Sequence, residues 1–406
     1  MNFHPRFMQK LIVSSVLGSL AVSGPALALD ADDFATKVAA IASQGGVKVS
    51  FASVEPDGDT IVLKSARVQS PGEAAVDIGD LTFNGVKDEN DGSYHVDQMQ
   101  FDDVNITGDG ISVSVVDIEL SGLTVPADPV YETIADVTFY EGFSTGRIVV
   151  DKGGKEIFSM TGVDLDVDRS DDDSRVSLLM NGSGMSIDLS EIRNPKAKQA
   201  LSALGYTTVT GDVTFDGIWD VEPGTFNLRE YSLSLDDIGR LAMSMEISGY
   251  TMEFIRAMQQ AQNAAAANPD PEAAQQALGF AMLGMLQQLS FNSAAIRFDD
   301  DSVTEKALDF AGKGQGISGD QMRMAIKGMM PLMLGQLGLP ALQQQISAAA
   351  NVYLDDPGSI TISARPASPV AVPVIMGAGM GDPKSLVDLL NVQVTANDPV
   401  EVCCNE

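Results

Sequence analysis

The chain contains very little cysteine. Among its 406 residues there are two cysteines, Cys403 and Cys404, which are adjacent and close to the end of the chain. This excludes a fold held together by several disulfides. In an oxidising compartment the pair would form a strained vicinal disulfide or join two chains. In the simpler interpretation the pair belongs to a terminal tail without a role.

Histidine is equally scarce, and common catalytic motifs are missing. His95 is the one histidine after the first 28 residues, in a predicted strand, where a single histidine usually fills surface or core space. The chain has no phosphate loop, no His-Glu-x-x-His and no Cys/His spacing for zinc. We therefore expect no cofactor and no enzymatic activity. One enzymatic alternative stays open, a hydrolase that uses two carboxylates as acid and base.

Positive charge is also in short supply. The chain has 25 Lys and Arg against 56 Asp and Glu, a formal charge of -31. Removing the first 28 residues with Arg6 and Lys10 would change -31 to -33. Such a field repels nucleic acid and anionic lipid headgroups and favours solubility or divalent cations. We expect no nucleic-acid partner.

The first 28 residues have the pattern of a secretory signal peptide. Arg6 and Lys10 precede an apolar stretch from Leu11 to Leu20, and Ala26-Leu27-Ala28 ends the segment. This order predicts cleavage after Ala28 and export to the periplasm. The alternative is an uncleaved anchor helix that would keep the protein at a membrane, although serine, glycine and proline dilute the apolar stretch.

From Val47 to Gly249 apolar and polar residues alternate, which predicts strands with one buried face in a mainly antiparallel sheet. One phrase recurs as Asp80-Leu-Thr-Phe-Asn-Gly-Val86, Asp117-Ile-Glu-Leu-Ser-Gly-Leu123 and Asp212-Val-Thr-Phe-Asp-Gly-Ile218. Glycine inside a strand usually marks a bulge or bend. Each copy is therefore expected to curve the sheet at a comparable place.

Near Tyr250 the composition changes to alanine, glutamine, methionine and leucine, which predicts helices. Residues 268–271, Asn-Pro-Asp-Pro, separate two of them, and a strand is expected from Ser290 to Phe298. The predicted fold is α+β, a long curved antiparallel sheet followed by helices that pack on it. The expected divisions are a signal peptide (1–28), a β-rich domain (29–249), a helical and mixed α/β region (250–395) and a tail (396–406).

Two sets of residues are candidate sites. Of the 19 methionines, 11 lie between Met243 and Met333, and methionine-rich surfaces adapt to apolar ligands of variable shape. Filling of a loose core is an equally good interpretation. The candidate ligand residues are Met282, Met285, Met329 and Met333. Asp164, Asp166 and Asp168 project from one face of a strand and are candidate calcium ligands, against the alternative of a solvated acidic face.

The signal peptide, the alternating strands with their repeated Asp-to-Gly phrase, and the apolar helices that follow resemble the AsmA-like and YdgA-like envelope proteins of bacteria. The resemblance covers mainly Val47 to Gly249. It implies a long curled sheet with an apolar groove and, for some members, lipid handling. It carries over no catalytic or ligand-binding residue.

The sequence thus predicts an exported, non-enzymatic envelope protein that binds a lipid-like apolar molecule or an envelope protein partner. The alternatives are an acidic structural or adhesive protein that uses calcium, and the carboxylate hydrolase.

Overall fold

The computed structural model describes residues 29–399 apart from 45–46, 71–73, 90, 129–133, 135–138, 193, 267, 269 and 336–337. The predicted signal peptide at 1–28 and the cysteine pair lie outside the described residues. Among the described residues, no helix is both long and apolar enough to cross a membrane.

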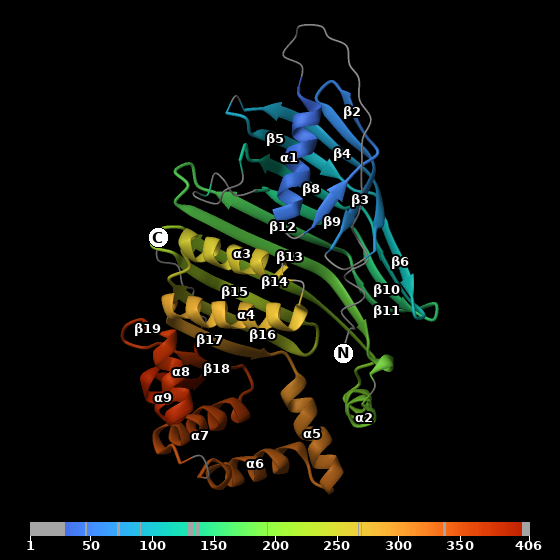
Figure 1. The fold of residues 1–406 in the computed structure, drawn as a ribbon. Helices are drawn as coiled ribbons and strands as arrows, with labels where there is room; N and C mark the ends of the chain where they lie inside the picture. Colours follow the sequence, from blue (N-terminus) through green and yellow to red (C-terminus); the bar gives the residue numbers. More distant parts are fainter. Residues whose placement is uncertain are drawn as a thin grey trace.

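All strands of the described residues belong to one curved antiparallel sheet, which confirms the predicted α+β class (Figure 1). The strands are β1 (Lys48–Ser50), β2 (Ser53–Asp57), β3 (Thr60–Gln69), β4 (Val76–Asp88), β5 (Tyr94–Gln100), β6 (Val104–Gly108), β7 (Ile111–Val115), β8 (Glu119–Val125), β9 (Gly142–Thr145), β10 (Ile148–Lys152), β11 (Lys155–Met160), β12 (Gly162–Arg169), β13 (Arg175–Asp188), β14 (Thr208–Asp220), β15 (Thr225–Leu235), β16 (Gly239–Ser248), β17 (Ser290–Asp300), β18 (Ser359–Ala364), β19 (Val370–Ala371) and β20 (Val392–Ala396).

The sheet is a meander in which each long strand pairs with the next. β5 and β6 act as one interrupted strand, because β5 pairs with β8 while β6 pairs with β7. β9 and β10 likewise act as one interrupted strand, and so do β11 and β12. β9 pairs with β12, and β10 pairs with β11. The meander continues through β13 to β18 and ends at β20. The β-rich segment and the helical segment therefore contribute to one sheet.

A line of backbone irregularity, here called the first crease, crosses the N-terminal strands. It contains Ser65, Gly79, Asp117 and Gly184, which all have positive φ angles, and the breaks between β5 and β6, β9 and β10, and β11 and β12. The apolar alternation shifts by one residue there. In β3, Ile61 and Leu63 are buried before Ser65, and Ala66 and Val68 after it. The shift keeps apolar side chains on the same side of a bent strand.

Aspartates from neighbouring segments satisfy backbone groups along the first crease. Asp80 Oδ1 accepts the Ser65 N–H at 2.9 Å, and Asp212 Oδ1 accepts the Gly184 N–H at 2.9 Å. A bent strand turns such N–H groups away from the ladder of the sheet, so they need another acceptor. Part of the acidity of the chain therefore has a structural role.

A second crease contains Gly85 and Gly122, with φ angles of 64° and 61°, and the register shift beside Gly217. These are the glycines of the three repeated phrases. Each copy has a local irregularity at its glycine, a positive φ angle in the first two and a register shift in the third, where the extra residue lies on β15. At Gly85 and Gly122 a Cβ would overlap the side chains of Asp97 and Glu141, which lie against the glycines.

The long helices at the N-terminal and central parts of the sheet lie on one face (Figure 1). The helices are α1 (Ala31–Gln44), α2 (Pro195–Ala203), α3 (Met252–Ala266), α4 (Pro271–Met285), α5 (Val303–Gln315), α6 (Gly319–Leu334), α7 (Pro340–Asp355), α8 (Val372–Gly381) and α9 (Ser385–Leu389), with short 3-10 turns η3 (Leu189–Glu191) and η4 (Leu286–Gln288).

The helical predictions hold in their main features. α4 begins at Pro271, and the Asp270 side chain accepts the N–H groups of Glu272 and Ala273, because proline and a capping carboxylate together favour a helix start. The expected strand is β17, which continues to Asp300. α1, α2 and α8 were not predicted.

Candidate functional site

One apolar residue from each long strand lies directly opposite its neighbour on the next strand, so that a continuous row crosses the sheet. We call this row the apolar ladder. Opposite residues in antiparallel strands point to the same face, so the row forms an apolar line on one side of the sheet. Its members are Ile61, Phe83, Met99, Leu120, Phe143, Leu165, Met180, Phe215, Tyr231, Met243, Ile296, Ile362 and Val394.

The repeated phrase supplies three members of this ladder. Phe83, Leu120 and Phe215 each occupy its fourth position, two residues before the glycine of the second crease. The aspartate that opens each phrase lies at the first crease. The phrase is thus the strand segment between the two creases, with the ladder residue inside it.

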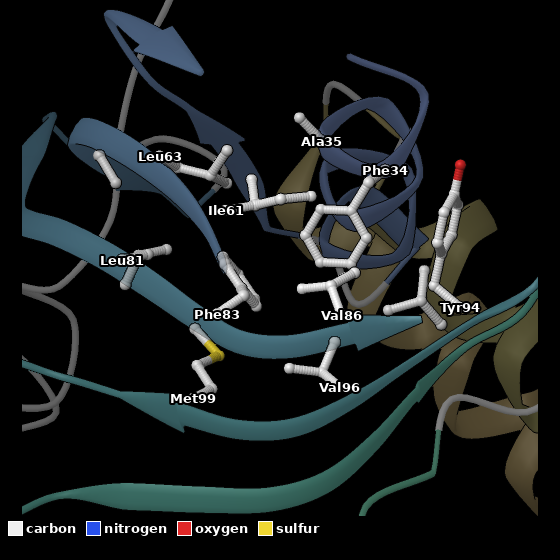
Figure 2. Close-up of a cluster of buried hydrophobic side chains, with 12 residues drawn as sticks. Phe34, Ala35, Ile61, Leu63, Leu81, Phe83, Val86, Tyr94, Val96 and Met99 are labelled. Atoms are coloured by element: carbon white, nitrogen blue, oxygen red, sulfur yellow. The ribbon is translucent and has the colours of Figure 1, made fainter. Parts of the chain in front are cut away.

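The ladder is closed at its N-terminal end by α1. Phe34 on α1 packs edge-on against Phe83 at 5.0 Å and Tyr94 at 5.4 Å between ring centroids (Figure 2). Ile61, Phe83 and Phe34 have no exposed surface. This cluster is the main hydrophobic core of the described residues.

Polar contacts fix α1 in this position. The Tyr94 hydroxyl donates to Asp33 Oδ2 at 2.7 Å, and Lys37 forms an ion pair with the same carboxylate. Hydrogen bonds from Lys37 and Tyr94 lower the pKa of Asp33. Burial, followed by the bond to Asp33, raises the pKa of Tyr94. α1 is therefore held by both apolar packing and a charged hydrogen bond.

The ladder is open between β15 and β18. Tyr231, Met243, Ile296 and Ile362 are all exposed, and the exposed fractions of Ile296 and Ile362 are 48% and 52%. Leu241, two residues from Met243 on the same face, is exposed as well. Strands lie about 4.8 Å apart, so these four neighbouring residues extend over about 15 Å. Contiguous exposed apolar surface of this kind marks an interaction site.

Helices border the open part on two sides. Trp219 on β14 donates its indole N–H to the Tyr250 carbonyl at 2.7 Å, and the rings of Phe226 and Phe254 also lie against Tyr250. At the far end of the ladder, Val394 is buried, and its N–H is accepted by Gln345 of α7 at 3.1 Å. The ladder residue that follows the open part, Val394, is therefore buried, while Phe215, which precedes it, is half-buried.

The four candidate methionines do not form one site. Met285 is buried on α4, whereas Met282 on the same helix is exposed. Met329 and Met333 are exposed on α6, which lies away from α4 at the far end of the molecule (Figure 1). The open part of the ladder was not predicted from the sequence. The one feature of the sequence that points to the ladder is the apolar residue at the fourth position of the repeated phrase.

Asp164, Asp166 and Asp168 lie on β12, and all three are exposed. Alternate residues of a strand are about 6.7 Å apart, too far for three successive carboxylates to surround one ion. Within the part of the chain that the structure describes, no group of three or more His, Cys, Asp or Glu could hold a metal ion. The arrangement does not bring the predicted calcium ligands together.

Ser144 lies in the sequence Gly142-Phe-Ser-Thr-Gly146, which has the residue spacing of a serine nucleophile elbow. The elbow requires a sharp turn between a strand and a helix, but Ser144 lies within β9. It lines a hollow of about 110 Å³ with acidic neighbours that include Asp164 and Asp166. His95 is on β5, 3.4 Å from Asp97 between Nε2 and Oδ1.

The described carboxyl groups whose pKa is shifted all have it lowered, by hydrogen bonds and ion pairs. Asp188 is the largest case, where Lys155 and Ser190 lower the pKa to about 2. A glycosidase-type general acid needs a raised pKa. These shifts are typical of paired structural carboxylates.

A larger cavity of about 380 Å³ lies beside α6 and is lined by Asp320, Arg323, Met324, Lys327 and Asp355. Its charges pair with one another, Arg323 with Asp320 at 2.7 Å and Lys327 with Asp355 at 2.7 Å. The cavity is thus balanced in charge.

A family model described as an uncharacterized protein matches residues 232–397. The matched segment begins within β15, ends after β20 and includes Met243, Ile296 and Ile362 of the open ladder. A comparison with curated proteins gives no match.

Proposed function

We propose that this protein binds an extended apolar molecule, such as an acyl chain, on the open part of the apolar ladder. The carrying observation is the exposure of four directly opposed residues, Tyr231, Met243, Ile296 and Ile362, in a row that is otherwise covered or half-buried. A narrow line of about 15 Å suits an elongated ligand. Methionine and isoleucine give it an apolar, adaptable surface.

The charge of the protein supports the choice of an apolar ligand. The open part of the apolar ladder contains no charged residue, although 20% of the residues in the chain are charged. Tyr231 alone carries a polar group, and its ring packs against Phe215 at 6.5 Å between centroids. An anionic polar ligand would meet the strongly acidic field of the protein.

The single tryptophan offers a direct test. Trp219 lies on the ladder face of β14, opposite Phe226. Acyl chains carrying bromine quench indole fluorescence at close range, so titration with a brominated chain should quench Trp219 in a saturable way. An unbrominated chain should displace it.

Two substitutions on adjacent strands localise the effect. Ile296→Glu places a charge in the open ladder and should weaken binding by about tenfold or more, because the apolar chain would have to desolvate it. Thr361→Glu is the control, on β18 opposite Arg297 and on the other face of the sheet. Equal losses in both variants, or no saturable quenching of the unmodified protein, would refute the proposal.

The same proposal includes export to a bacterial envelope and a role like that of AsmA-like proteins in lipid handling. It is supported by the sequence pattern of residues 1–28 and by the resemblance of the strand phrases. Mass determination of the N-terminus of the purified protein checks the first part, since export with cleavage predicts a chain that begins at Leu29.

A further inference from the structure

Two helices that carry a single charge between them, Glu272, meet the sheet at the same place. Residues 273–296 and 366–381 contain no Asp, Glu, Lys or Arg, and they include most of α4 and all of α8. The two segments meet at the start of β17, where Ser290 pairs with Ala371 and the Val372 N–H donates to the Leu289 carbonyl at 3.0 Å. We call α4 and α8 the helix pair.

Both helices expose large apolar side chains. On α4, Ala274 and Met285 are buried, while Phe280 and Leu283 lie on the opposite side, with Phe280 exposed to 73%. On α8 the exposed side chains are Val374, Met376 and Met380, the last to 82%. Neither segment has a charged side chain next to these exposed apolar residues. Such surfaces in a soluble protein mark contact with another apolar body.

The distribution of charge favours a lipid bilayer over a protein as the surface that these helices contact. The chain carries 56 Asp and Glu, yet α4 and α8 together contain one of them, Glu272 in the first turn of α4. A specific protein partner is usually oriented by charged and hydrogen-bonding groups around an apolar centre. A neutral bilayer requires none, because apolar side chains enter its interface without fixed partners. An anionic bilayer would repel the rest of this protein.

The pair is also next to the proposed ligand site. β17 begins where the two helices meet, and the same strand carries Ile296 of the open ladder. We propose that α4 and α8 dock on the surface of an uncharged lipid bilayer, which supplies the apolar chain that the ladder binds. This inference rests on the proposed function for the source of the ligand, but docking itself is measurable without it.

Flotation of the purified protein with phosphatidylcholine vesicles tests the docking. The unmodified protein should float with these vesicles and much less with vesicles of anionic phosphatidylglycerol. The double substitution Phe280→Asp and Met380→Asp should reduce the bound fraction by about tenfold or more, because it removes two apolar anchors and adds charge. Both sites are exposed, so folding should be retained.

Met324→Asp is the matched control. Met324 is exposed to 71%, about as much as Phe280, but it lies on α6 between the charged residues Arg323 and Lys327. This variant should float like the unmodified protein. If it loses binding as the double variant does, or if the unmodified protein does not float, the docking inference is overturned.

The two proposals fail separately. Flotation without quenching of Trp219 by a brominated chain would leave bilayer docking and remove the ladder site. Quenching of Trp219 by a soluble brominated chain without flotation would support the ladder site and overturn bilayer docking. Ile296→Glu should lose quenching but still float.

Discussion

The N-terminal and C-terminal parts of the sheet carry the same apolar ladder in two different environments. Under α1, Phe83 and Ile61 are completely buried, whereas between β15 and β18 Ile296 and Ile362 are about half exposed. The strands, register and residue types are comparable in both parts. The difference arises from what covers them, a short helix fixed by Phe34 and Asp33 in one part and an incomplete helical border in the other.

The closed and the open part of the ladder therefore have different roles. Burial of a large apolar side chain stabilises a protein by roughly 1.5–3 kcal/mol, so the closed part of the ladder contributes to folding. The open part gives up this stabilisation. An apolar surface kept exposed in this way is available to a ligand that supplies the missing cover.

The largest expected effect is a contrast in stability between the two parts. Phe34→Ala should lower the free energy of unfolding by about 3–5 kcal/mol, because it leaves a cavity over Phe83 and Tyr94. Met243→Ala, in the open part, should cost less than about 1 kcal/mol, because water already reaches the side chain. Urea denaturation followed by circular dichroism measures both. Similar losses would contradict the distinction between a closed and an open part.

The next prediction compares Gly184, which lies in the first crease, with Gly153, which lies outside it and has almost the same φ angle. Gly184 and Gly153 have φ angles of 60° and 61°. A Cβ at Gly184 would overlap Thr161, whereas nothing lies within 4 Å of one at Gly153. Gly153→Ala should therefore cost about 1 kcal/mol for the left-handed conformation alone, and Gly184→Ala about 2–4 kcal/mol.

Unfolding in urea again gives the comparison. Equal costs at the two glycines would mean that the first crease is not closely packed.

A smaller effect is expected from acid. The pKa of Asp33 in the folded protein lies below its usual value of 3.8, so its bonds to Lys37 and Tyr94 stabilise the fold above that value. This stabilisation is lost as the pH falls through the lowered pKa. The stability difference between the unmodified protein and Asp33→Asn should be constant near neutral pH and should shrink as the pH falls below about 4. A constant difference would show that the Asp33 charge does not help to hold α1.

The sequence predicted the sheet well and the site poorly, for reasons visible in particular residues. Alternation and the Asp-to-Gly phrases report local backbone behaviour, so the strands and the bends at Gly85 and Gly122 could be predicted. The exposure of Ile296 depends on which helices lie above it, and Phe34 and Phe83 meet only through the folding of distant segments. The density of methionine drew attention to Met329 and Met333 on α6 instead of the open ladder.

A crystal structure of the protein grown with a brominated acyl chain would show whether the open part of the ladder binds an extended apolar chain, because anomalous scattering locates the bromine atoms. The predicted result is bromine density against Met243, Ile296 and Ile362, with the chain running across the strands. Density confined to the cavity beside α6, or no bound bromine at a concentration that saturates Trp219 quenching, would contradict it.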